Sequence, residues 1–263
     1  MAIVFKMKQK QNELFFLIQF SFVLKWLEIK ARYRRTSFGI LWEMLSFGAY
    51  VGVVSAIWSL VLKIPFIENF TNLIVVFSGW RLAFNAIYGA TQEVMEANNT
   101  LYKNYSAASS LPQLNCFFGS LLQFCASLPL FLIALIYNQN LEFQIEYFLA
   151  LCFCFPALYM SLKPISYACS INADLRFTIQ TALNFVMLIS PVLWPISMLG
   201  ENWIIMLLNP LAIFIIIFKS AFIHEANLVN FEMVAIAFVF WFILIIVLHW
   251  ICSKFNAKLL KLV

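Results

Sequence analysis

The sequence predicts an all-α integral membrane protein, and three properties of its composition support this. Hydrophobic residues make up 63% of the 263 residues and charged residues only 11%, and the mean hydropathy is +0.89. A soluble domain carries about 25% charged residues, so a chain this apolar could not cover its surface with polar groups in water. We expect a single membrane domain over residues 1–263, with a cytoplasmic and interfacial segment at 1–37, the membrane region at 38–252 and a cytoplasmic tail at 253–263.

Seven apolar stretches are long enough to cross a bilayer, since about 20 helical residues span its hydrocarbon core of about 30 Å. They are Phe38–Leu62, Asn69–Glu93, Pro112–Tyr137, Glu146–Cys169, Phe177–Met198, Trp203–Ile223 and Phe231–Cys252. A shorter stretch of 11 residues, Leu14–Leu24, precedes them and continues into the charged residues Lys25 and Glu28. Its length and its charged flank predict an interfacial helix in the plane of the membrane, with Trp26 as an anchor.

The distribution of basic residues predicts that both ends of the chain face the cytoplasm. Basic residues precede the first stretch and follow the last one, and such residues stay on the cytoplasmic side. They are Lys6, Lys8, Lys10, Lys25, Lys30, Arg32, Arg34 and Arg35 before it, and Lys254, Lys258 and Lys261 after it. Two ends on one side require an even number of crossings, so one of the seven stretches does not cross.

Trp203–Ile223 is the stretch that we expect not to cross, because Asn209-Pro210 interrupts it. Proline removes a backbone hydrogen bond and clashes with the preceding turn. The stretch therefore predicts two re-entrant half-helices between the fifth and sixth of six transmembrane helices, and such broken backbone must be buried in protein or line a cavity. Eight crossings, with Leu14–Leu24 as the additional one, satisfy the same parity, but the length and charge of that stretch argue against this count.

Three arginines, Arg32, Arg34 and Arg35, lie directly before the first predicted span. Arginine binds phosphate through a planar, bidentate fork, so this cluster can meet the phosphates of a lipid substrate. Basic residues at this position also hold the first helix in its orientation, and the cluster can serve both purposes.

Residues 98–111 form a polar, helix-compatible segment that faces the cytoplasm if the chain crosses six times. A linker does not need the apolar and aromatic side chains that this segment carries, whereas a short helix that docks into the groove of a partner does. An ordinary connecting loop is the alternative. The candidate docking residues are Asn99, Leu101, Tyr102, Lys103 and Tyr105.

Arg81 is a charged residue that we expect at membrane depth. It lies 12 residues past Asn69, which corresponds to about 18 Å along a helix and so to the region near the bilayer centre. A charge there is costly and indicates a functional residue that faces the protein interior or water. A span boundary shifted by several residues would instead let it snorkel to the outer interface.

Aromatic residues also fall at crossing depth, and three of them, Trp80, Phe84 and Tyr88, share one helix face. An aromatic face inside a water-filled path can stack on sugar rings, while the alternatives are a lipid-facing belt and packing between helices. The candidate residues for a translocation path are Trp58, Trp80, Arg81, Phe84, Tyr88 and Trp194.

The sequence shows no pattern of catalytic or metal-binding residues. None of its six cysteines has C-x-x-C spacing, so we expect small packing residues, no disulfide and no metal. It has no G-x-x-x-x-G-K-[ST] phosphate-binding loop and no Ser-His-Asp or Cys-His set. The two histidines, His224 and His249, have no acidic or cysteine cluster beside them. We therefore expect no cofactor and no catalytic residue on this chain.

Several motifs occur in order from about Lys25 to Lys219. They are Arg32-Tyr33-Arg34-Arg35-Thr36-Ser37-Phe38-Gly39-Ile40-Leu41-Trp42, Phe77-Ser78-Gly79-Trp80, Asn99 to Leu111-Pro112, Asp174-Leu175-Arg176, Ser190-Pro191-Val192-Leu193-Trp194-Pro195, Asn209-Pro210-Leu211 and Phe218-Lys219. This order resembles the membrane-spanning permease subunits of type-2 ABC exporters, in particular those for capsular polysaccharide or O-antigen. The chain departs from that family at Phe47-Gly48, where proline is common, at Arg81, which is usually apolar, and at Lys219, which is usually arginine.

The resemblance implies the permease subunit of an ATP-driven exporter that moves lipid-linked polysaccharide, such as capsule or O-antigen of lipopolysaccharide, across the bacterial inner membrane. It implies an N-terminal interfacial helix, six spans and re-entrant half-helices between the last two. It also implies a homodimer with two copies of a separate ATP-binding subunit, which would hold ATP and Mg²⁺, and residues 98–111 would be the coupling helix. The other expected partners are the lipid-linked glycan and membrane lipids, with no nucleic acid. Arg81 would suit an anionic glycan.

Three other functions stay open. A permease of the same architecture for a small drug or a lipid would have a narrow apolar path without sugar stacking. A membrane-embedded acyl- or glycosyltransferase would gather acid, base or metal-binding residues at one depth, and only Glu43, Glu93 and Glu96 cluster near the inner face. A structural membrane subunit without a transport role is the third.

Overall fold

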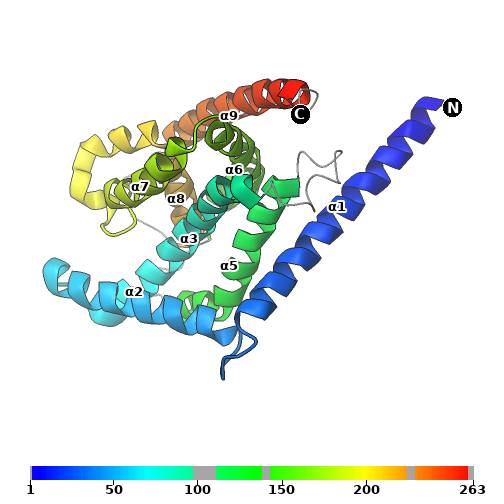
Figure 1. The fold of residues 1–263 in the computed structure, drawn as a ribbon. Helices are drawn as coiled ribbons and strands as arrows, with labels where there is room; N and C mark the ends of the chain where they lie inside the picture. The colour runs from blue at the N-terminus through cyan, green and yellow to red at the C-terminus, as the bar shows by residue number, and fades with distance from the viewer. Residues whose placement is uncertain (1, 97–110, 138–142, 224–228, 260–263) are drawn as a thin grey trace.

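The computed structural model describes residues 2–96, 111–137, 143–223 and 229–259, and every regular element in these ranges is a helix (Figure 1). The elements are α1 (Ala2–Arg32), α2 (Leu41–Leu62), α3 (Phe66–Glu96), α5 (Leu111–Tyr137), α6 (Ile145–Ile171), α7 (Asp174–Ile189), the 3₁₀ helix η1 (Ile196–Leu208), α8 (Pro210–Ser220) and α9 (Phe231–Leu259). Within the described ranges, five helices are long and apolar enough to cross a membrane: α2, α3, α5, α6 and α9. The chain thus has the multi-pass, all-helical character that its sequence predicts.

The fifth predicted span, Phe177–Met198, is only partly helical. Helix α7 has 16 residues and ends at Ile189, which gives it a length of about 24 Å, less than the hydrocarbon core of about 30 Å. The reason is Pro191, because the residue before a proline is disfavoured in the α region. Ser190 accordingly has an extended backbone, with ψ of 154°. The pair η1 and α8, bent by 115°, could supply one further crossing if it formed a single span.

Helix α1 is longer than the interfacial helix that we expected at Leu14–Leu24. It has 31 residues and contains neither glycine nor proline. The lysines, glutamines and glutamates that end the apolar stretch are themselves good helix formers, so they do not end the helix. Helix α1 lies beside α5 at the edge of the molecule (Figure 1), and the Phe22 and Phe118 rings meet edge to face at 6.0 Å.

Helix α3 is the centre of the fold and packs against α2, α5, α6, α7 and α8. It is the least apolar of the five candidate spans, with a hydropathy of 1.3, and 72% of that window is buried. Helix α9 is the opposite case, with a hydropathy of 2.8 and only 6% buried. Polar side chains need hydrogen-bonding partners inside the protein, whereas apolar side chains can face lipid without cost. The more polar α3 is therefore central, and the more apolar α9 is peripheral.

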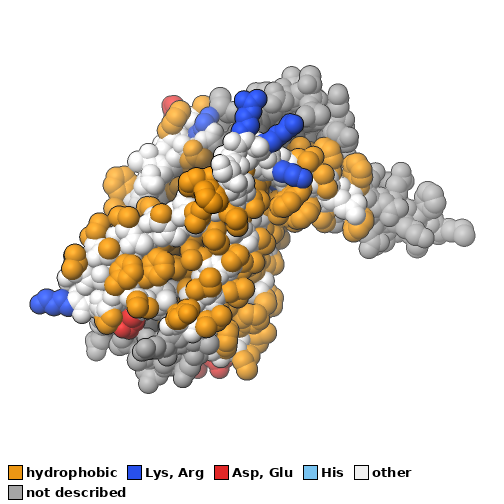
Figure 2. Space-filling view, turned by 90° about the horizontal axis from the view of Figure 1, so that it is seen from below, with side chains coloured by type: hydrophobic (Ala, Val, Ile, Leu, Met, Phe, Trp, Pro, Cys, Tyr) orange, Lys and Arg blue, Asp and Glu red, His pale blue; other side chains and the backbone are white. Residues whose placement is uncertain are grey.

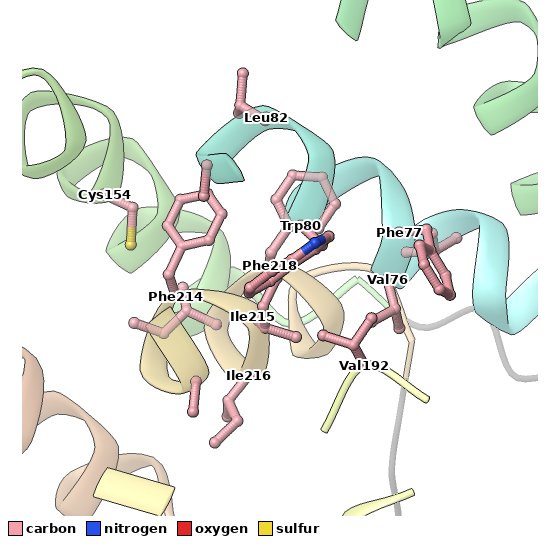
Figure 3. Close-up of a cluster of buried hydrophobic side chains, with 14 of the residues drawn as sticks. Val76, Phe77, Trp80, Leu82, Cys154, Val192, Phe214, Ile215, Ile216 and Phe218 are labelled. Carbon is pink, nitrogen blue, oxygen red and sulfur yellow. The ribbon is translucent and has the colours of Figure 1, made fainter. Parts of the chain in front are cut away.

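Helix α8 packs against the middle of α3 and is buried on every side over residues 212–220. Phe214 and Phe218 of α8 lie close to Trp80 of α3 in the core (Figure 3). The two helices approach closely at Gly79, where an added Cβ would stand 2.7 Å from the Phe218 ring. Only glycine fits at this contact without a shift of the ring.

We expect Gly79→Ala to lower the stability of the protein by about 1–3 kcal/mol, because the new methyl group overpacks the α3–α8 contact. The measurement is the thermal unfolding midpoint in mild detergent. Gly52→Ala is the matched control, since its Cβ would meet Phe70 at an ordinary 3.7 Å. Restoration of the midpoint by Gly79→Ala/Phe218→Leu would support the stated cause, and an unchanged midpoint for Gly79→Ala would contradict it.

Candidate functional site

A cavity of about 330 Å³ lies between α2, α3 and α7. We call it the aromatic cavity, because four of its lining residues are Phe or Trp and a fifth is Tyr. Its lining consists of Ser46, Phe47, Tyr50, Phe77, Trp80, Arg81, Phe84, Asn184 and Met187. On each helix these residues are adjacent or three to four positions apart, so they follow one face. The volume falls in the range of about 300–1,000 Å³ that small-molecule sites occupy.

The aromatic rings of α3 form a continuous row that begins in this cavity. The ring centroids of Trp80 and Phe84 are 6.1 Å apart, and those of Phe84 and Tyr88 are 5.8 Å apart with nearly parallel planes. Trp80 is 5% exposed and Tyr88 is 39% exposed, so the row leads from a buried ring in the cavity wall to the surface. Tyr50 of α2 meets Phe77 of α3 edge to face at 5.5 Å.

Arg81 forms an ion pair with Glu43 at the edge of the aromatic cavity. Its Nη2 lies 3.0 Å from Oε2 of Glu43, and its guanidinium carbon lies 5.1 Å from the centroid of the Phe47 ring. Its Nη1 is buried and has no hydrogen-bond partner among the residues that the structure describes. Because Glu43 lies in the first turn of α2, Arg81 stands level with the beginning of that helix.

Glu43 also connects this ion pair to the turn that holds the arginine cluster. Helix α1 ends at Arg32, and residues 33–40 form turns that carry Arg34 and Arg35. Burial raises the pKa of Tyr33, and its hydrogen bond to Glu43 and the charge of that carboxylate raise the pKa further. The hydroxyl of Tyr33 therefore faces the same carboxylate that Arg81 binds.

The three arginines of the cluster are all exposed. Figure 2 shows basic side chains gathered at one edge of a broad apolar face, on the side of the molecule where α2 lies. This arrangement brings cationic groups next to a surface that is suited to lipid.

The remaining path residues predicted from the sequence do not line the aromatic cavity. Trp58 is half-buried on α2. Trp194 follows α7 and donates a hydrogen bond from Nε1 to the carbonyl oxygen of Leu188 at 3.0 Å, so it satisfies a carbonyl at the end of that helix. The candidate docking residues Asn99, Leu101, Tyr102, Lys103 and Tyr105 lie outside the described residues.

The chain breaks between η1 and α8 at Asn209 and Pro210, with the two helices bent by 115°. Pro210 is the first residue of α8, a position where its missing N–H costs nothing. Asn209 caps α8, because its Oδ1 accepts a hydrogen bond from the backbone N–H of Leu211 at 3.0 Å. Its Nδ2 donates to Ser190 Oγ at 3.1 Å, so the break is tied to the end of α7.

Sequence reasoning missed several residues of the aromatic cavity, including Phe47, Tyr50 and Asn184. On α2 a signal was present, because Glu43, Phe47 and Tyr50 are four and three residues apart and thus share a face. For Asn184 the local sequence offers no such signal, since its place depends on how α7 packs against α3.

A second cavity of about 270 Å³ lies mainly between α6, α8 and α9, with one residue from α3. Its lining is almost entirely apolar and includes Leu158, Phe214 and Phe238. The six cysteines are all free. His249 of α9 has Nδ1 3.0 Å from the carbonyl oxygen of Met160. Among the described residues no group of three or more His, Cys, Asp or Glu side chains could hold a metal ion.

No family model matches this sequence, and no curated protein matches it.

We expect removal of one partner of the Arg81–Glu43 pair to destabilise the protein more than removal of both. Arg81→Met or Glu43→Met alone leaves a shielded charge without its partner and should cost about 3 kcal/mol, whereas the double variant leaves two apolar side chains. The measurement is the thermal unfolding midpoint of the four proteins in one detergent. A double variant that is less stable than both single variants would contradict the pairing.

Proposed function

We propose that this chain is the permease subunit of an ATP-driven ABC exporter that moves lipid-linked polysaccharide, of the capsule or O-antigen type, across the bacterial inner membrane. The observation that carries the proposal is the row of aromatic rings from Trp80 through Phe84 to Tyr88, which begins in a cavity and ends at the surface. Aromatic faces hold sugar rings through apolar contact without reading each substituent. Such weak and repeated binding suits a polymer that must keep moving.

In this proposal the chain crosses the membrane six times, through α2, α3, α5, α6, α7 and α9. The bent pair of η1 and α8 is then the re-entrant element, α1 lies at the interface, and both termini face the cytoplasm. Helix α7 is short for a crossing, and local thinning of the bilayer can accommodate a short hydrophobic helix at a modest cost. The exposed arginines Arg32, Arg34 and Arg35 would meet the phosphates of the lipid carrier through their guanidinium forks.

The active transporter would contain two copies of this chain. Both α2 and α7 flank the aromatic cavity, and both expose large apolar side chains. These include Val53, Ile57 and Leu60 on α2, and Phe185, Leu188 and Ile189 on α7. A second copy against this side would cover the apolar surface and enclose the cavity. Two copies of an ATP-binding subunit would dock on residues 98–111 and supply the ATP hydrolysis.

An exporter for a small apolar drug or a lipid is the second candidate, and the cavity between α6, α8 and α9 favours it. That cavity is of similar size but has an almost wholly apolar lining, which suits an acyl chain better than a sugar. The two candidates differ in which cavity the substrate needs. Loss of export after substitution of Tyr88 would favour the glycan, and loss after substitution of Phe238 would favour the apolar substrate.

We expect the chain to co-purify with an ATP-binding subunit in a complex of two copies of each. The chain would be expressed with the ATP-binding protein encoded beside it, extracted in mild detergent, purified through a tag on this chain and weighed by native mass spectrometry. A chain that purifies alone, with no nucleotide-binding partner, would contradict the proposed class of transporter.

We expect Leu101→Asp and Tyr105→Asp to uncouple ATP hydrolysis from transport, because a buried carboxylate would be placed in the docking contact. The measurement is substrate-stimulated ATPase activity of the reconstituted complex. Lys63→Asp, which changes the charge of the exposed residue after α2, is the control and should keep its stimulation. Unchanged stimulation in the Leu101 and Tyr105 variants would contradict the assignment of this segment.

A further inference from the structure

We propose that the aromatic cavity is a binding site for acidic sugars, in which Arg81 exchanges the carboxylate of Glu43 for a carboxylate on the sugar ring. This inference rests on the proposed glycan transport and names the class of glycan: a polymer with uronic acid residues.

The guanidinium of Arg81 uses only some of its hydrogen-bond donors. Arginine offers five N–H donors in a planar fork that matches the two oxygens of a carboxylate. Arg81 meets Glu43 through Nη2 and a single oxygen, while Nη1 is buried and finds no acceptor in the described part of the chain. A shielded donor without an acceptor is destabilising. A carboxylate that accepts from two donors at once would remove this cost.

The walls around Arg81 contain both aromatic and hydrogen-bonding side chains. Trp80 and Phe84 present aromatic surface to the cavity, and such surface packs on the C–H face of a sugar ring. Ser46 and Asn184 line the same space. The Ser46 hydroxyl donates to the carbonyl oxygen of Trp42 at 2.7 Å and can accept from a sugar hydroxyl, while the Asn184 amide can both donate and accept. The cavity thus combines a guanidinium, hydrogen-bonding side chains and aromatic surface. These match the carboxylate, the hydroxyls and the apolar ring face of a uronic acid.

Arg81 is the accessible member of the ion pair. Its side chain is 20% exposed and lines the cavity, whereas the Glu43 side chain is 9% exposed and is not part of the lining. An incoming carboxylate would therefore reach Arg81 from the cavity. After release the Glu43 carboxylate keeps the Tyr33 hydroxyl as a partner. Arg81 also retains the Phe47 ring beneath it, which favours a cation by its quadrupole.

The exchange makes binding weak, as transport of a polymer requires. The incoming carboxylate replaces an existing one, and the gain from better geometry and from the use of Nη1 is offset in part because the released Glu43 loses its cation. Glu43 then stands near a second negative charge, which further limits the affinity. A neutral sugar has no group that can displace Glu43, and the site therefore prefers acidic residues.

The experiment compares two probes with the same sugar rings, one with free carboxylates and one with those carboxylates masked as methyl esters. Tetragalacturonate and its methyl ester would be titrated into the full-length protein in detergent by calorimetry. We expect the acid to bind about tenfold more tightly than the ester. Arg81→Gln should abolish this preference, so that this variant binds the acid no more tightly than the ester. Glu43→Gln, which removes the competing carboxylate, should tighten binding of the acid by about threefold or more. Lys163→Gln, a buried cation on α6, is the control and should change neither.

The possible failures are distinguishable. Equal binding of acid and ester would overturn the acidic-sugar site and leave the aromatic path intact, whereas no binding of either would overturn both the site and the proposed glycan transport. Full displacement of the acid by an equal concentration of inorganic phosphate would overturn the sugar assignment. If Arg81→Gln does not fold, the proposal is tested by Glu43→Gln. Unchanged or weaker binding of the acid by the Glu43→Gln protein would overturn it.

Discussion

Helix α3 carries amide, hydroxyl and guanidinium groups through apolar surroundings, and each of them must find a partner within the protein. In lipid an unsatisfied polar group costs several kcal/mol. Asn69 donates to the backbone of Ser55 in α2, and Asn85 donates to Gln123 in α5. The carbonyl of Ala90 accepts from Ser166 in α6 at 3.0 Å. Each of these bonds holds one neighbouring helix in register with α3, so the positions of α2, α5 and α6 follow from the polar residues of one helix.

The same constraint explains the irregular segment between α7 and α8. The backbone after α7 leaves the helical conformation at Ser190, and its polar groups would be costly in lipid. Ser190, Pro191 and Val192 are buried, and the Ser190 hydroxyl accepts from Asn209. Helix α8 lies beside this segment and is apolar on all sides from Leu211 to Phe218 because protein surrounds it, whereas the similarly apolar α9 is mostly exposed. Apolarity alone does not distinguish a core helix from a lipid-facing one.

The sequence is a good guide to which segments are helical and apolar, and a poor guide to how those helices face one another. The spans α2, α3, α5, α6 and α9 were predictable because length and hydropathy decide them. The end of α7 was missed although Pro191 marks it, because apolar residues continue past it. The length of α1 was missed because hydropathy shows where apolar residues lie and not where a helix ends. In the site, the shared face of Trp80, Phe84 and Tyr88 follows from helical spacing. The contacts of Arg81 with Glu43 and of Asn184 with the cavity depend on helix rotation, which no local pattern encodes.

On the proposed function, a fixed charge on a path for polymers creates a conflict that the Arg81–Glu43 pair would resolve. The row of aromatic rings would let a sugar chain move along it without a deep minimum. An unpaired arginine would hold an anionic chain at one point and would also be costly for the protein itself. Pairing with Glu43 reduces both effects. The charge of the arginine is neutralised when no substrate is bound, and an anionic substrate must compete with Glu43 for the arginine. On the proposed function, the carboxylate that allows α3 to carry a charge among apolar side chains is therefore also the group that limits how tightly the substrate binds.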